Sequence, residues 1–123
     1  MSEKLDIYKS AIRVELAKKR LADSPLSEFN KSKILEYIKI CYARGLSAHR
    51  INKYFDTLRT IISWLNKDVS NITSEDILNL LVRINQSDLS EWTKRDYKTF
   101  SRAFLEWAGY EKELELIKPG RSP

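Results

Sequence analysis

The sequence is poor in the residues that build active sites and sharp turns. Its 123 residues include one cysteine, one histidine, three glycines and three prolines. One cysteine cannot form an internal disulfide, and together with one histidine it cannot supply a Cys/His metal cluster. The glycines (Gly45, Gly109 and Gly120) lie too far apart for a phosphate-binding loop. The scarcity of glycine and proline leaves few turns and favours helices.

Long apolar runs are absent as well. No stretch of about 18 apolar residues occurs, so no membrane-spanning helix is expected. Residues 1–6 contain neither an apolar run nor a small-residue cleavage site, which argues against a signal peptide. With only one cysteine, the chain is expected in a reducing, cytoplasmic setting.

No group of residues has the spacing of a catalytic site. The carboxylates are scattered over the expected helices, where solvated surface charge is their ordinary role. Cys41 lies on an apolar stripe, which indicates a small core residue rather than a nucleophile. We therefore expect no catalytic residue, no metal ion and no cofactor in this chain.

The charge is moderately basic. Lys and Arg number 22 and Asp and Glu 17, which gives a net charge of +5 and an isoelectric point near 9.3. Such a balance permits nucleic-acid binding but does not require it. The positive excess lies in the N-terminal half, whereas residues 69–88 carry one positive and three negative charges.

Apolar residues recur at spacings of three and four along most of the chain, which indicates amphipathic helices. The expected helices span residues 3–22, 27–44, 47–66, 74–85 and 90–108. In the first helix the expected buried stripe is Leu5, Tyr8, Ile12 and Leu16. We predict an all-α fold with four core helices and one extra N-terminal helix.

A spaced pattern occurs twice, at an offset of 43 residues. Leu-Ser, six residues, Tyr, four residues, Arg, four residues and Trp begins at Leu46 and again at Leu89. Ser47 and Ser90 are candidate N-caps, because a serine hydroxyl accepts from the unpaired amides of the first helical turn. Thr73 is a third candidate N-cap, with acidic residues in the turn that follows it.

Both repeat helices carry a basic and hydroxyl-bearing face. Helix 47–66 offers His49, Arg50, Lys53, Thr57 and Thr60, and helix 90–108 offers Thr93, Lys94, Arg95, Lys98 and Arg102. Arg and Lys neutralise DNA phosphates, and Thr and Ser donate to them, so two such faces could hold a duplex. The alternative is that they are solvated helix faces.

The aromatic and arginine residues of the repeat could contact DNA or could pack and pair within the protein. Tyr54, Tyr97, Trp64 and Trp107 are expected in or beside the core rather than as base-stacking platforms. Arg59 and Arg102 either contact phosphate or pair with acids within the bundle. Trp92 lies off the apolar stripe of its helix, and the pattern assigns it no role.

Several segments resemble a known family. They are residues 45–54 (GLSAHRINKY), Leu58, Trp64-Leu65, residues 72–77 (ITSEDI), and the return from Leu89-Ser90 to residues 104–107 (FLEW). In order and spacing they resemble the core-binding domain of tyrosine recombinases, the family of phage integrases and Xer-type recombinases. The resemblance covers roughly residues 25–108 and implies a four-helix, SAM-like orthogonal bundle.

The resemblance also implies a role in site-specific DNA integration or recombination. In that family this domain is one jaw of a C-shaped clamp, and it places helices in the major groove of the recombination site. The catalytic jaw carries a nucleophilic Tyr, two Arg, a Lys and a His-x-x-Arg element. It has no match here, because His49 is the only histidine and Asn52 stands three residues after it. We expect a non-catalytic domain, with residues 110–123 resembling a linker to the missing one.

The expected organisation is an N-terminal helix at 1–23, a core-binding bundle at 24–109 and a tail at 110–123. The N-terminal helix could pack on the bundle, contact a neighbouring protomer, or touch DNA through Lys18, Lys19 and Arg20. The expected DNA-binding residues are Ser47, His49, Arg50, Lys53, Thr57, Thr93, Lys94, Arg95, Lys98 and Arg102. About five phosphate contacts would give a log–log salt slope near −4 to −5 and binding in the micromolar range.

The expected partners are double-stranded DNA and other recombinase protomers, in a prokaryotic nucleoid or in a virus or plasmid system. No membrane or small-molecule partner is expected. The alternative function is a small helical protein–protein interaction module. Salt separates the two functions, because binding to phosphates weakens as salt rises, whereas docking of an apolar helix does not.

Overall fold

The computed structural model describes residues 2–115, with side chains for residue 9 and residues 11–115. Over this range the fold is all-helical and contains no strand, which confirms the predicted class. The helices are α1 (Ser2–Asp23), α2 (Glu28–Ala43), α3 (Ala48–Leu65), α4 (Ser74–Gln86), α5 (Glu91–Trp107) and α6 (Glu111–Glu115), with a 3₁₀ turn, η1 (Val69–Asn71). The first five helices lie within one residue of their predicted ranges. None of the described helices combines the length and apolar character needed to cross a bilayer.

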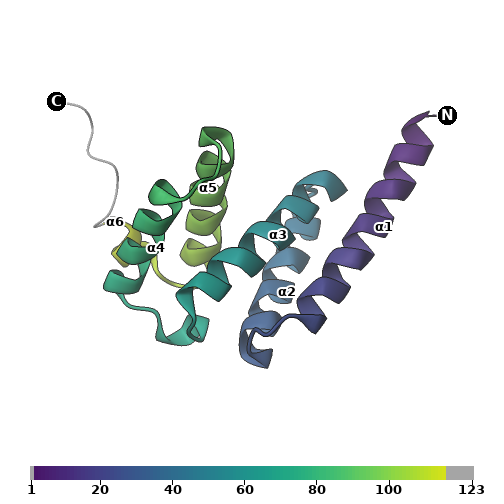
Figure 1. Cartoon of the computed structure of the whole chain (residues 1–123). Coiled ribbons are helices and arrows are strands. Elements are labelled where there is room, and N and C mark those ends of the chain that lie inside the picture. Colours follow the sequence, from purple (N-terminus) through teal and green to yellow (C-terminus); the bar gives the residue numbers. More distant parts are fainter. Residues whose placement is uncertain (1, 116–123) are drawn as a thin grey trace.

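Helix α3 is the element around which the other helices pack. It contacts α1 and α2 on one side and α4 and α5 on the other. Figure 1 shows α3 running through the middle of the molecule, with α1 and α2 at one end and α4, α5 and α6 at the other. The apolar face of α3 is almost completely removed from water, at Ile51, Phe55, Leu58, Ile61 and Ile62. Burial of this face makes a large hydrophobic contribution to the stability of the fold.

A cluster of aromatic rings joins three helices. Tyr37 of α2 lies 5.4 Å from the ring of Tyr54 in α3, and 5.5 Å and 5.4 Å from Phe104 and Trp107 in α5. Edge-to-face and tilted ring pairs of this kind add to the free energy gained by burial alone. Burial, together with a hydrogen bond to Tyr54, raises the pKa of the Tyr37 phenol. The cluster therefore stays neutral and fixes α2, α3 and α5 together.

The buried face of α1 differs from the predicted one. Ile12 and Leu16 are 43% and 47% exposed, so the predicted stripe is wrong at these two positions. Leu5 and Tyr8 lie outside the described side chains. The buried stripe is Val14, Ala17 and Leu21, which packs in the same core as α3. The sequence of α1 contains two apolar stripes, and its contact with α3 determines which of them is buried.

Side-chain hydrogen bonds confirm the predicted N-caps. The Oγ atoms of Ser47 and Ser90 each accept from a backbone amide three residues later, both at 3.2 Å. Thr73 forms a reciprocal capping box, in which its Oγ1 accepts from the Asp76 N–H at 3.2 Å and an Asp76 oxygen accepts from the Thr73 N–H at 2.9 Å. These contacts satisfy amides that have no partner within the helix and so determine where α3, α4 and α5 begin.

The capping carboxylate should make part of the stability depend on pH. The Lys67 ammonium, 2.7 Å away, and the Thr73 amide lower the pKa of Asp76. A lowered pKa in the folded state means stabilisation that is present above the ordinary aspartate pKa and lost as the pH falls below it. We expect Asp76→Asn to lower the thermal midpoint at pH about 7 and to differ less from wild type near pH 3. Thermal melts at both pH values test this, and equal differences at both would contradict it.

The segment that follows α5 packs on the bundle. Leu114 of α6 is buried, and α6 contacts both α4 and α5. The Tyr110 hydroxyl donates to the carbonyl of Val69 and accepts from the Ile72 amide at 3.2 Å. Residues 110–115, the first part of the expected tail, therefore belong to the packed structure. The remainder of the expected linker, residues 116–123, lies outside the described residues.

Candidate nucleic-acid interface

The two repeat helices meet near their N-terminal halves. Tyr54 of α3 stacks on Phe100 of α5, with ring centres 4.3 Å apart. The Arg50 guanidinium lies 5.5 Å from the centre of the same Phe100 ring. Lys53 pairs with Asp96 across the contact at 3.5 Å. Two of the predicted residues of α3, Arg50 and Lys53, thus lie where the two helices touch.

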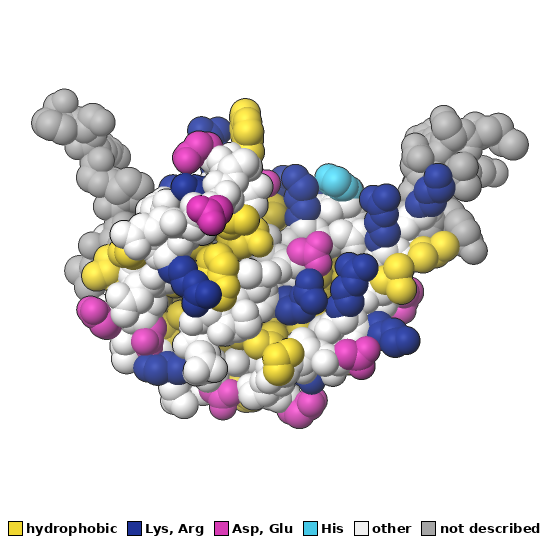
Figure 2. Space-filling model, in the orientation of Figure 1, with side chains coloured by type: hydrophobic (Ala, Val, Ile, Leu, Met, Phe, Trp, Pro, Cys, Tyr) yellow, Lys and Arg dark blue, Asp and Glu magenta, His cyan; other side chains and the backbone are white. Residues whose placement is uncertain are grey.

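Four of the predicted residues on α3 are accessible. Ser47, His49, Arg50 and Lys53 are all exposed. Figure 2 shows Lys and Arg side chains gathered around the single histidine over α1 and α3, with acidic side chains between them. The Ser47 hydroxyl is already engaged as a cap, so His49, Arg50 and Lys53 are the groups available to a ligand. Of these, Lys53 is shared with Asp96 in an exposed ion pair.

Thr57, although one of the predicted DNA-binding residues, is not accessible. Its side chain is only 4% exposed, although the predicted face placed it in line with Lys53. One turn earlier Lys53 and Tyr54 contact α5, and two turns later Trp64 lies 6.0 Å from the Tyr97 ring. Thr57 lies between these contacts along α3, on a part of the helix that is removed from solvent.

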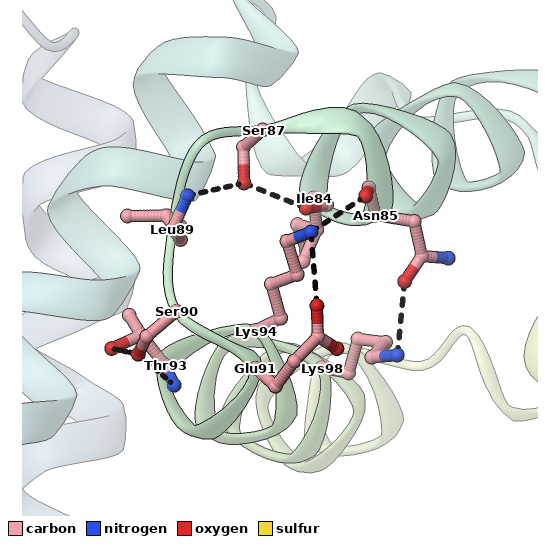
Figure 3. A network of polar contacts seen from close by, with 9 residues as sticks. All are labelled: Ile84, Asn85, Ser87, Leu89, Ser90, Glu91, Thr93, Lys94 and Lys98. Atoms are coloured by element: carbon pink, nitrogen blue, oxygen red, sulfur yellow. Dashed lines mark hydrogen bonds and ion pairs between the residues drawn. The ribbon is translucent and has the colours of Figure 1, made fainter.

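Lys94 and Lys98 also depart from the predicted interface. Lys94 Nζ donates to the backbone oxygen of Asn85 at 2.9 Å, and Lys98 Nζ donates to the Asn85 side-chain oxygen at 2.9 Å. Figure 3 shows both lysines reaching from α5 to the end of α4, with Glu91 beside Lys94. The last carbonyls of a helix lack intrahelical partners and carry partial negative charge, so lysines stabilise them. Lys94 therefore caps α4, and its side chain is only 13% exposed. Lys98 holds the Asn85 side chain instead.

The remaining predicted residues of α5 differ among themselves. Arg95 is exposed, and its guanidinium lies 5.1 Å from the centre of the Trp92 ring, which is itself 74% exposed. Thr93 is half-buried and accepts a hydrogen bond from the Ser90 hydroxyl at 2.9 Å. Arg102 is half-buried and makes contacts within the protein. Arg95 and Trp92 are thus the accessible pair on the first turns of α5.

Contacts within the protein bear on most of the alternatives left open by the sequence. Arg59 lies 3.5 Å from Asp56 and so pairs with an acidic residue of its own helix. Tyr54 is buried, and Trp64 packs between Tyr97 and the Arg83 guanidinium, which lies 4.4 Å from its ring centre. Cys41 is buried among apolar side chains, and burial raises the pKa of its thiol.

Two basic residues of α1 extend this surface. Arg13 and Arg20 are exposed and border a groove whose other wall includes His49 and Lys53 of α3. The available signal was their spacing of seven residues, which puts them on one face of α1. Arg20 was a candidate DNA contact from the sequence, whereas Arg13 was missed because the expected packing of α1 used the wrong stripe.

Comparisons with known proteins add no information about this interface. The chain matches no family model, no curated protein and no solved structure. Among the described residues, no three His, Cys, Asp or Glu side chains lie close enough together to hold a metal ion. What the described residues do bring together is a basic, solvent-facing surface on α1, α3 and the first turns of α5.

Proposed function

We propose that this chain binds double-stranded DNA through the first halves of α3 and α5, as the core-binding domain of a tyrosine recombinase or integrase does. The observation that carries the proposal is the meeting of the two repeat helices at the Lys53–Asp96 pair, with Arg50 and Arg95 exposed beside it. Two capped helices that present cations from one junction suit the backbone of a duplex, with side chains of the first turns near the base edges.

The order of elements supports the finer fold within this proposal. After α1, the chain runs through α2, an L-S helix (α3), a T-S-E-D helix (α4) and a second L-S helix (α5). That order is the one expected of a SAM-like, four-helix orthogonal bundle. In the two-domain clamp of tyrosine recombinases, the core-binding domain has no catalytic residue and depends on the second domain for strand cleavage.

The burial of Thr57 and the hydrogen bonds of Lys94 and Lys98 to Asn85 reduce the expected number of phosphate contacts. Three cations remain at the α3–α5 junction: Arg50, Lys53 and Arg95. Each neutralised phosphate contributes about −0.9 to the log–log slope of affinity against salt. These three residues alone therefore predict a slope of about −3, which is less steep than the −4 to −5 expected for about five contacts.

The test is fluorescence anisotropy of a labelled random-sequence duplex of about 30 base pairs, at several salt concentrations from about 50 to 200 mM. We expect Arg50→Gln/Arg95→Gln to weaken binding about tenfold at about 100 mM salt, and to reduce the slope by about two. The control is Lys39→Gln/Lys112→Gln, which removes two exposed charges elsewhere. A wild-type chain that leaves the anisotropy unchanged at about 100 μM protein and low salt would rule out the proposal.

A protein–protein interaction module is the second candidate, because pairs of apolar side chains are exposed on other helices. Leu35 and Tyr42 of α2 are 44% and 47% exposed, and Leu78 and Val82 of α4 are both 43% exposed. Scattered exposed apolar side chains are common on monomeric proteins, so they favour this candidate only weakly. Binding to a partner through these residues would persist at salt concentrations that abolish binding to DNA.

A further inference from the structure

Helices α1 and α3 enclose a surface groove beside the α3–α5 junction. Its volume is about 290 Å³. Arg13, Leu16 and Arg20 line it from α1, and His49 and Lys53 line it from α3. All five of these side chains are exposed, so the groove opens to solvent. It shares His49 and Lys53 with the proposed DNA-binding surface.

The groove is cationic. Among the side chains that the structure describes, none pairs with Arg13 or Arg20. Asp56 and Lys53 also line the groove, but each has an ion-pair partner 3.5 Å away, Arg59 for Asp56 and Asp96 for Lys53. The two arginines of α1 therefore supply most of the positive charge of the groove. Arginines that face water without an acidic partner create a positive potential, and this potential attracts anions.

The spacing of the two arginines suits an extended anion. Seven residues separate Arg13 from Arg20, which places them about 10 Å apart along the axis of α1. Phosphates of one DNA strand advance about 3.4 Å per nucleotide along the duplex axis, so this separation corresponds to about three phosphates.

We infer that the α1–α3 groove binds the phosphate backbone of duplex DNA next to the stretch held by α3 and α5. This inference rests on the proposed function, because the groove shares Lys53 with the α3–α5 junction. It makes α1 a third DNA-contacting helix. Two added cationic contacts increase the expected number of phosphate contacts from three to five. The salt slope of the wild-type chain then steepens from about −3 to about −4.5.

The test compares two double variants that lose the same charge from the same helix. Arg13→Gln/Arg20→Gln removes the groove arginines. Lys18→Gln/Lys19→Gln is the control, because both lysines are exposed and neither lines the groove. In the duplex titration at about 100 mM salt, we expect about tenfold weaker binding for the groove variant and a slope less steep by about two. The control should remain within about twofold of wild type.

A third variant, Arg13→Lys/Arg20→Lys, keeps the charges and should retain the wild-type slope, and circular dichroism checks the helicity of every variant. Equal losses in the groove variant and its control would overturn the inference in favour of a general charge effect. If the groove variant binds like wild type while Arg50→Gln/Arg95→Gln binds more weakly, the inference that the groove contacts DNA is wrong and the proposed function still stands. A wild-type chain that fails to bind duplex DNA would overturn both.

Discussion

Replacing Phe104 with alanine is expected to lower the free energy of unfolding by about 4 kcal/mol. The Phe104 ring is completely buried, 5.5 Å from Tyr37 and 5.7 Å from Trp107. Truncation removes the buried ring and leaves a cavity, because close-packed neighbours relax only in part. Domains of this kind are stable by about 5–15 kcal/mol, so the loss is a large fraction of the total.

Urea denaturation followed by circular dichroism measures this loss. Trp92→Ala is the matched control, since Trp92 is an aromatic residue of the same helix but is 74% exposed. Substitutions at exposed positions usually change stability by less than about 0.5 kcal/mol. If Phe104→Ala cost no more than Trp92→Ala, the aromatic cluster would not be what holds α5 to α2 and α3.

The aromatic cluster also bears on DNA binding. Tyr37 contacts α3 through Tyr54 and α5 through Phe104 and Trp107, so these rings hold the two proposed DNA-binding helices in one orientation. A surface that must match the spacing of phosphates needs its helices held rigidly relative to one another. The part of the sequence that binds DNA in our proposal therefore depends on a core residue of α2.

The helices and their starting points could be predicted because the signals are local. A serine at the N-cap satisfies amides within one turn, and no distant residue is needed for that contact. Ser47, Ser90 and Thr73 all cap as predicted. The apolar face of α3 was also predictable, because its seven apolar positions form one continuous stripe with no competing face.

The direction of the basic side chains could not be predicted in the same way. Lys94 and Lys98 point to the end of α4 because Asn85 lies there in space, nine and thirteen residues earlier in the chain. The short loop between α4 and α5 was the signal for this, since it brings the last carbonyls of α4 near the first turns of α5. Thr57 was misplaced for a related reason: periodicity shows which residues share a face, but not which helix covers that face.

Periodicity gave no reason to single out Asn30 either, although it is among the few buried polar side chains in residues 2–115. It is 4% exposed and joins α2 to the connection between α3 and α4. Its Nδ2 donates to the Lys67 carbonyl at 2.8 Å, and its Oδ1 accepts from the Val69 amide at 2.8 Å. Val69 is itself 3% exposed, so water cannot readily replace the lost partner.

Asn30→Ala is expected to destabilise the fold by about 3 kcal/mol, because it leaves a buried amide and a carbonyl without partners. Ser32→Ala is the control, an exposed position on the same helix. Urea denaturation measures the total loss, and hydrogen exchange of the Val69 amide locates it. We expect this amide to exchange much faster in Asn30→Ala while the amides of α5 exchange at rates set by the lower global stability. Unchanged protection of Val69 would mean that the Asn30 hydrogen bonds do not hold the connection. The start of α4 would then depend on Tyr110 and the Thr73 capping box alone.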